Sequence, residues 1–138
     1  MKKVDKLSHH LEKNSGARLK CVFCEIEDYV LANELAYAIF DKFPVSPGHM
    51  LIIPNRHIGS FFDATLEEKL ALLDLLDKAK EHVDKLYRPS GYNIGINDNE
   101  VAGQTIMHLH IHLIPRYIGD MEDPRGGIRG CIPEKRIY

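Results

Sequence analysis

The sequence of 138 residues lacks a long apolar run. Its apolar stretches fall well short of the roughly 20 residues that a membrane-spanning helix needs. The first residues, Met-Lys-Lys-Val-Asp, also lack the apolar segment of a secretory signal peptide. From these absences we expect a protein that makes no membrane contact and stays in the cytoplasm.

An excess of charge of one sign is missing as well, because 18 Lys and Arg residues stand against 20 Asp and Glu residues. A formal net charge of −2 gives no broad positive field, so we expect no nucleic-acid partner. This balance does not exclude a small anionic ligand held by local hydrogen-bond donors. The chain has no internal repeat, biased tract or linker, so we expect one domain over residues 1–138.

Hydrophobic periodicity predicts the elements of this domain. Apolar residues at helical spacing indicate a short amphipathic helix over 2–14 and a long helix over 66–86, with a capping-box pattern at Thr65–Glu68. Apolar runs bounded by turn residues predict strands at 29–32, 36–40, 49–53, 92–96 and 107–114. Because these strands follow one another without a βαβ rhythm, we predict an α+β fold with a mainly antiparallel sheet.

Three histidines alternate with apolar residues in the last of these runs. On a strand, His108, His110 and His112 would share one face while the residues between them face the core. Three explanations are open: a histidine-rich polar face, a metal site, or nucleophilic catalysis by one imidazole whose neighbours hold its tautomer and bind an anion. The preceding Gly-Gln-Thr run, with small polar donors and a flexible backbone, favours catalysis.

Three segments together resemble the histidine-triad (HIT) family: Gly103–Arg116 with its three histidines, His49–His57 after a Pro-Gly pair, and Phe23–Ile26. The resemblance covers about residues 20–118 and implies a HIT-like fold over that core, between a helical N-terminal extension and a C-terminal tail. The tail segments Arg116–Asp120 and Pro124–Arg129 look like those of bacterial members described as diadenosine-polyphosphate hydrolase-like.

The resemblance implies a nucleotide hydrolase in which His110 attacks the α-phosphorus and forms a nucleotidyl-histidine intermediate. The other ring nitrogen of His110 would donate to a backbone carbonyl, and His112 would donate to a non-bridging phosphate oxygen. Water would then release a nucleoside monophosphate. Thr105 corresponds to a hydroxyl beside the leaving group, Gln104 is a candidate phosphate contact, and His108 completes the triad.

The same resemblance implies a nucleotide site. Asp41 corresponds to an acidic residue that binds the ribose hydroxyls, and Asn97 to a polar residue near the ribose and phosphate. The other nucleotide-binding positions are four apolar residues that sandwich the base and one glycine: Val22, Phe23, Ile26, Ile39 and Gly103. The expected substrates are dinucleoside polyphosphates or nucleoside phosphoramidates, with adenine as the expected base.

Two alternative functions remain open at this point. One is a non-catalytic nucleotide-binding or partner-binding module. The other is a zinc-water hydrolase in which all three histidines are metal ligands.

The chain has three cysteines, which in a cytosolic protein argue against a disulfide framework. Cys21 and Cys24 form a C-x-x-C pair that could be two inert thiols, a redox pair or half of a metal site; a redox pair is the weakest explanation because no thioredoxin-like pattern surrounds it. The resemblance implies that His57 and His108 complete a structural zinc site. His49 and His82 are left over, and we interpret both as structural or solvent-facing.

Members of the family are typically homodimers, and the resemblance therefore implies a homodimer here. We expect the long helix and the strand before it to form the interface.

Overall fold

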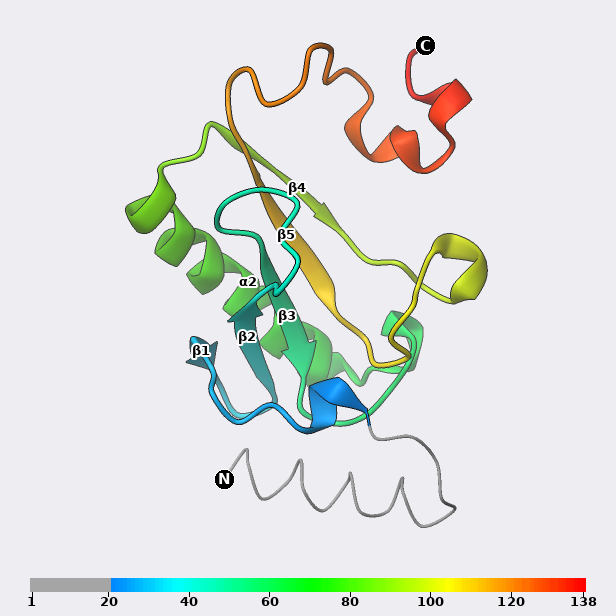
Figure 1. Ribbon diagram of the computed structural model, residues 1–138. Coiled ribbons are helices and arrows are strands. Elements are labelled where there is room, and N and C mark those ends of the chain that lie inside the picture. Colours follow the sequence, from blue (N-terminus) through cyan, green and yellow to red (C-terminus); the bar gives the residue numbers. More distant parts are fainter. Residues whose placement is uncertain (1–20) are drawn as a thin grey trace.

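The computed structural model describes residues 21–138, and the short helix expected over 2–14 lies outside the described residues. The described chain forms a sheet of antiparallel strands in the order β1-β2-β3-β5-β4, with one long helix (Figure 1). The elements are β1 (Leu31–Ala32), β2 (Ala36–Phe40), β3 (Met50–Pro54), α2 (Leu66–Tyr87), β4 (Gly91–Gly95) and β5 (Ile111–Arg116). The predicted α+β fold with an antiparallel sheet is confirmed.

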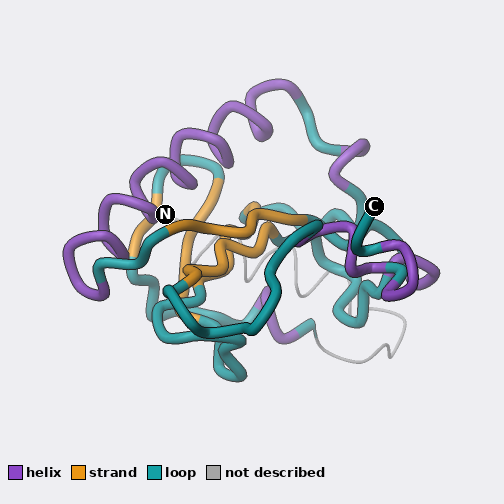
Figure 2. The backbone as a smooth tube through the Cα atoms, turned by 90° about the horizontal axis from the view of Figure 1, so that it is seen from above, coloured by secondary structure: helices purple, strands orange, loops and turns teal. Residues whose placement is uncertain are grey.

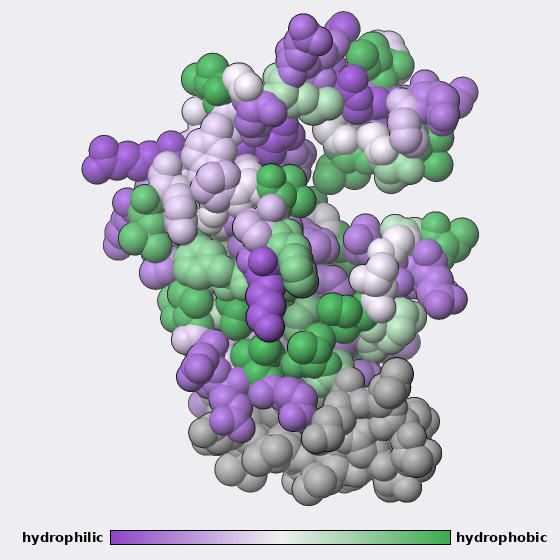
Figure 3. All heavy atoms as spheres, viewed as in Figure 1, coloured by the Kyte–Doolittle hydropathy of each residue, from purple (hydrophilic) through white to green (hydrophobic). Residues whose placement is uncertain are grey.

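The central strand β3 is buried on both faces. Met50 and Ile52 belong to the core that α2 covers, whereas Leu51 and Ile53 belong to a second apolar cluster on the opposite face. A strand buried on both sides needs apolar residues at every position, which explains the uninterrupted run in the sequence. Figure 2 shows α2 along one side of the sheet, and in Figure 3 hydrophobic residues gather on the other side over the strands.

The helix α2 begins at the predicted capping box. The Thr65 hydroxyl accepts a hydrogen bond from the Glu68 backbone N–H at 3.1 Å, and the Glu68 carboxylate accepts one from the Thr65 backbone N–H at 2.8 Å. The same carboxylate accepts two hydrogen bonds from the Arg56 guanidinium, at 2.8 and 2.9 Å. Because Arg56 follows β3 closely, this buried carboxylate fixes the start of α2 against the end of the central strand.

The prediction of one strand over 107–114 is wrong at both ends. β5 begins at Ile111, so His108 and His110 lie in the loop that leads into it. At the other end β5 continues through Pro115. This proline pairs with β4 alone, since the pairing of β5 with β3 stops at Leu113. A proline is tolerated where a strand is paired on one side only. His108 and His110 are buried, so they do not form an exposed polar face.

The segment after β5 forms two short 3₁₀ helices, η5 (Gly127–Cys131) and η6 (Pro133–Lys135), and η5 contacts β4. The guanidinium of Arg136 holds this segment together by donating to the backbone carbonyls of Asp123 at 2.6 Å and Arg125 at 2.7 Å. No helix in the described part of the chain is long and apolar enough to cross a membrane.

Candidate active site and metal centre

A cavity of about 820 Å³ opens where the 3₁₀ turn η2 (Val22–Cys24), the end of β2 and the loop before β5 meet. All of the nucleotide-binding residues that the sequence predicts line this cavity, together with part of the predicted catalytic set: Val22, Phe23, Ile26, Ile39, Asp41, Asn97, Gly103, Thr105, His110 and His112. The fold therefore brings together residues from segments far apart in the sequence around one space. Its lining combines apolar side chains of η2 and β2 with the histidines, and acidic side chains such as Glu25 and Asp28 also lie in it.

His110 is held in one tautomer by the backbone. Its Nδ1 lies 2.8 Å from the carbonyl oxygen of His108, an acceptor only, so Nδ1 carries the proton and donates it. The lone pair therefore lies on Nε2, the nitrogen that is left for the cavity. Burial lowers the pKa of His110 below its ordinary value of 6.5, which keeps the ring neutral near pH 7. A neutral imidazole with a free lone pair can act as a nucleophile.

His112 is held in the opposite tautomer by a chain of hydrogen bonds through His49. The Val45 backbone N–H donates to Nδ1 of His49 at 3.0 Å, so the proton of a neutral His49 is on Nε2. That Nε2 lies 3.0 Å from Nδ1 of His112, which must accept. His112 therefore carries its proton on Nε2. Burial and the neighbouring imidazoles lower the pKa of His112 to about 4, so the ring is neutral and presents this N–H as a donor.

His49, which sequence reasoning interpreted as structural or solvent-facing, is buried and contacts the candidate site through His112. It precedes β3 by one residue, and the pairing of Leu51 with His112 across β3 and β5 brings the two imidazoles together. The signal in the sequence was its place at the start of an apolar strand, but strand pairing is needed to connect it with the triad. His82, the other histidine set aside, lies on α2 with its ring 6.0 Å from that of Phe40.

Potential metal-ligand atoms also lie close together in a cluster of Asp41, His49 and His112. The hydrogen bonds of this cluster do not suit a metal ion. A metal on Nε2 of His49 would require the proton on Nδ1, where the Val45 N–H already donates. Nε2 of His49 lies 3.5 Å from a carboxylate oxygen of Asp41, which favours a proton at that nitrogen. This cluster is therefore better described as a hydrogen-bond network.

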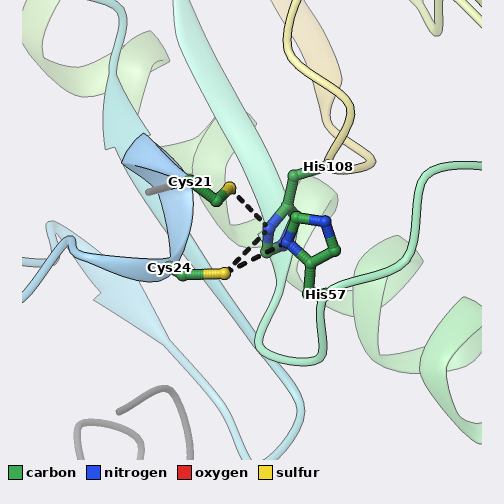
Figure 4. Close-up of side chains that lie close together, drawn as sticks. All are labelled: Cys21, Cys24, His57 and His108. Carbon is green, nitrogen blue, oxygen red and sulfur yellow. Dashed lines mark hydrogen bonds between the residues drawn. The ribbon is translucent and has the colours of Figure 1, made fainter. Parts of the chain in front are cut away.

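A second cluster does suit a metal. Cys21, immediately before η2, and Cys24, the last residue of η2, point toward the rings of His57 and His108 (Figure 4). The Sγ of Cys21 lies 3.4 Å from Nδ1 of His108, and the Sγ of Cys24 lies 3.2 Å from Nδ1 of His57. The ligand atoms of all four residues lie within 4.8 Å of one another.

The protonation state of this cluster also fits a metal. Nε2 of His108 donates to the carbonyl oxygen of Pro54 at 2.9 Å, so the lone pair on Nδ1 faces the sulfurs. Metal-ligating histidines typically donate their other ring N–H in this way. Hydrogen bonding with Cys24 lowers the pKa of the Cys21 thiol, which favours the thiolate that binds metals. Two cysteines and two histidines form a tetrahedral donor set typical of zinc.

Two predicted assignments need a different description. Gln104 does not line the cavity: its amide N–H groups donate to the carbonyls of Gly59 and Ile106, and its carbonyl accepts from the Asn99 backbone N–H. With both donors used, Gln104 shapes the loop and has no N–H left for a phosphate. The zinc-water alternative is not supported either, because His108 faces the cysteines while His110 and His112 line the cavity.

The chain is similar in sequence and fold to known proteins of one family. A family model described as "HIT domain" matches residues 25–119 of the chain. A HIT-like protein of 16.1 kDa from Mycoplasma pneumoniae is 38% identical over 116 residues, which cover 78% of each chain. A protein named AP-4-A phosphorylase from Mycobacterium tuberculosis is 34% identical over 79% of this chain and 60% of its own length. A crystal structure of a zinc-bound histidine triad family protein from Mycobacterium smegmatis matches with a TM-score of 0.66 at 30% identity, covering 75% of this chain and 79% of that one.

Proposed function

The chain belongs to the histidine-triad (HIT) family, and on that premise we propose that it is an enzyme that transfers a nucleoside 5′-phosphoryl group to water through His110. The observation that carries this proposal is the tautomer of His110. Its Nδ1–H is committed to the His108 carbonyl, so the Nε2 lone pair is available in a cavity of a size that accepts a nucleotide.

The proposed reaction has two steps. In the first, the Nε2 lone pair of His110 forms a bond to the α-phosphorus, and the bond from that phosphorus to the leaving group breaks. The Nε2–H of His112 donates to a non-bridging oxygen and stabilises the charge that develops there. In the second step the oxygen of water bonds to phosphorus, the N–P bond breaks, and the water loses a proton as the nucleoside monophosphate forms.

The lining of the cavity supports a nucleotide substrate. Val22, Phe23 and Ile39 provide an apolar wall on which a base can stack, and Asp41 can accept hydrogen bonds from two ribose hydroxyls. The substrate classes that we propose are dinucleoside polyphosphates and nucleoside phosphoramidates, with adenine as the base. The name of the relative AP-4-A phosphorylase supports the first class. Thr105 lies in the lining, where its hydroxyl can contact the phosphate or leaving group.

We also propose that Cys21, Cys24, His57 and His108 hold a zinc ion. The donor set and the orientation of His108 support this metal, and so does the zinc-bound relative from Mycobacterium smegmatis. With four protein ligands the ion has no open coordination position, so it would fix local geometry and would not activate water.

The test is the release of AMP from diadenosine tetraphosphate and from adenosine 5′-phosphoramidate, followed by chromatography. We expect the wild type to turn over at least one of these substrates. We expect His110→Ala to lose more than roughly 10³-fold in kcat because it has no nucleophile. His82→Gln, a histidine change on α2, is the matched control and is expected to keep its activity.

Three other outcomes would contradict parts of this proposal. If His110→Ala is as active as the wild type, His110 is not the nucleophile. If the wild type binds AMP without turning over either substrate, the protein is a nucleotide-binding module. If turnover of diadenosine tetraphosphate requires added inorganic phosphate, then phosphate, not water, accepts the nucleotidyl group.

A further inference from the structure

The turn η2 belongs to both candidate sites at once. Its N-cap residue Cys21 and its last residue Cys24 are the candidate metal ligands. The two residues between them, Val22 and Phe23, line the candidate nucleotide cavity. The turn is compact, because the Cys24 backbone N–H donates to the Cys21 carbonyl at 3.1 Å. The candidate metal ligands and part of the cavity wall therefore share one short backbone segment.

Phe23 connects this turn directly to the nucleophile. Its ring lies edge-on to that of His110 with centroids 5.1 Å apart, and to that of His108 at 6.0 Å. The side chain is 5% exposed, and its backbone carbonyl accepts a hydrogen bond from the Tyr37 hydroxyl at 2.6 Å. The position of Phe23 relative to His110 thus depends on the same four-residue turn that presents the sulfurs.

His108 provides a second connection. Its side chain faces the sulfurs of Cys21 and Cys24 through Nδ1, at 3.4 and 3.6 Å. Its backbone carbonyl accepts the Nδ1–H of His110 and so fixes the tautomer of the nucleophile. One residue therefore presents a ligand to the metal cluster and an acceptor to the catalytic ring.

We propose that metal occupancy and nucleotide affinity are coupled through the turn Cys21–Cys24 and His108, so that the metal site regulates the nucleotide site. A metal held by the four ligands fixes the apolar wall and the carbonyl behind His110, and so lowers the cost of ordering the cavity for a nucleotide. This inference rests on the proposed function, because it needs both a metal and a nucleotide to bind. By linkage the effect is reciprocal: a bound nucleotide strengthens metal binding by the same factor.

The experiment measures both affinities on the full chain. Calorimetry gives the AMP affinity of zinc-loaded and chelator-stripped protein, and equilibrium competition with a chromogenic chelator gives the zinc affinity with and without saturating AMP. We expect zinc to strengthen AMP binding by roughly 5- to 150-fold, and AMP to strengthen zinc binding by the same factor. Equal AMP affinities in the loaded and stripped protein would overturn the proposal.

Circular dichroism separates local coupling from folding. We expect the stripped protein to keep its folded spectrum; coupling that appears only together with loss of that spectrum would overturn the local explanation. Protein that binds no zinc, or no AMP, would overturn the coupling together with the metal or the nucleotide part of the proposed function. Binding of both without coupling would overturn this inference alone.

Two variants locate the connection. Phe23→Ala keeps all four ligands but removes the ring that contacts both His108 and His110. We therefore expect weaker AMP binding and an AMP effect on zinc affinity that falls to about 2-fold or less. Cys131→Ser changes an exposed thiol outside the cluster and is expected to keep the full coupling. Full coupling in Phe23→Ala would show that the wall does not carry it and would contradict the proposal.

Discussion

At the scale of single residues, the three histidines of the motif differ in which ring nitrogen holds the proton. His110 donates through Nδ1 to a backbone carbonyl, whereas His108 donates through Nε2 to another. His112 accepts at Nδ1 from His49 and so keeps its own proton on Nε2. Each ring is thus set, by one neighbour, in the tautomer that its proposed role needs: nucleophile for His110, metal ligand for His108 and hydrogen-bond donor for His112.

The pH dependence of activity follows from these rings. Burial lowers the pKa of His110 below 6.5 and that of His112 to about 4, so both are neutral above the ordinary histidine range. Protonation of His110 removes the attacking lone pair; activity is therefore present at higher pH and is lost as the pH falls through the lowered pKa. We expect a plot of kcat/KM for adenosine 5′-phosphoramidate against pH to be flat near pH 7. An acid limb with an apparent pKa of 6.5 or higher would contradict this.

His49 is expected to matter through His112. His49→Ala removes the donor to Nδ1 of His112, so that the His112 proton is no longer confined to Nε2. We expect kcat to fall about 100-fold while AMP binding changes little. His49→Gln retains an N–H near the position of Nε2 and is expected to recover part of the lost rate. Equal rates in the two variants would argue against a role through this hydrogen bond.

Much of the candidate site could be predicted from the sequence, but the residues whose contacts depend on strand pairing could not. His110, His112, Asp41 and the apolar wall follow from the motif resemblance, and they line one cavity. His49 could not be connected to His112 because their contact depends on the register between β3 and β5. The hydrogen bonds of Gln104 could not be predicted from the sequence either, because its three backbone partners depend on the conformation of the loop.

At the scale of elements, the turn that leads into β3 requires a glycine at position 48. Gly48 has φ of +89°, and a Cβ there would lie 2.8 Å from the ring of Tyr87 at the end of α2. The loop thus passes close to the helix and places His49 at the start of the strand. Helix spacing and the capping box could be predicted from the sequence, but this close approach could not, because it depends on how α2 packs against the sheet.

We expect Gly48→Ala to lower the free energy of unfolding by about 1–3 kcal/mol, from backbone strain and the contact with Tyr87. Gly91→Ala is the matched control, since a Cβ at Gly91 would meet no atom within 4 Å and its φ is not in the left-handed region. Urea denaturation of the two variants measures the difference. Similar stabilities would show that the loop before β3 can move away from α2 at little cost.

At the scale of the whole molecule, the expected homodimer interface needs a correction. The strand before the long helix cannot take part, because β3 lies inside the sheet and all five of its residues are buried. α2 does carry exposed leucines beside its buried stripe. Leu66, Leu70 and Leu73 are 68%, 57% and 52% exposed, at the spacing of one helix face. We propose that this face forms the dimer.

Light scattering at micromolar concentration is expected to give the mass of two chains. The double variant Leu70→Glu with Leu73→Glu is expected to shift the protein to a monomer, because it places charges in the apolar contact. Lys78→Glu, on another side of α2, should leave the dimer intact. A monomeric wild type would contradict the dimer, and a dimer that survives the double variant would move the interface away from these leucines.

The strand order has a consequence for how the site comes into being. β1, β2 and β3 pair as neighbours along the chain, and so do β4 and β5, but β3 and β5 join across the whole of α2. Closing a long loop costs more entropy than forming a hairpin, so that junction is expected to form late on the folding pathway. His49 and His112, 63 residues apart, and Cys21 and His108, 87 residues apart, meet only across it. A chain in which this junction has not formed therefore contains every histidine of the motif, but these residues are not assembled into the proposed site.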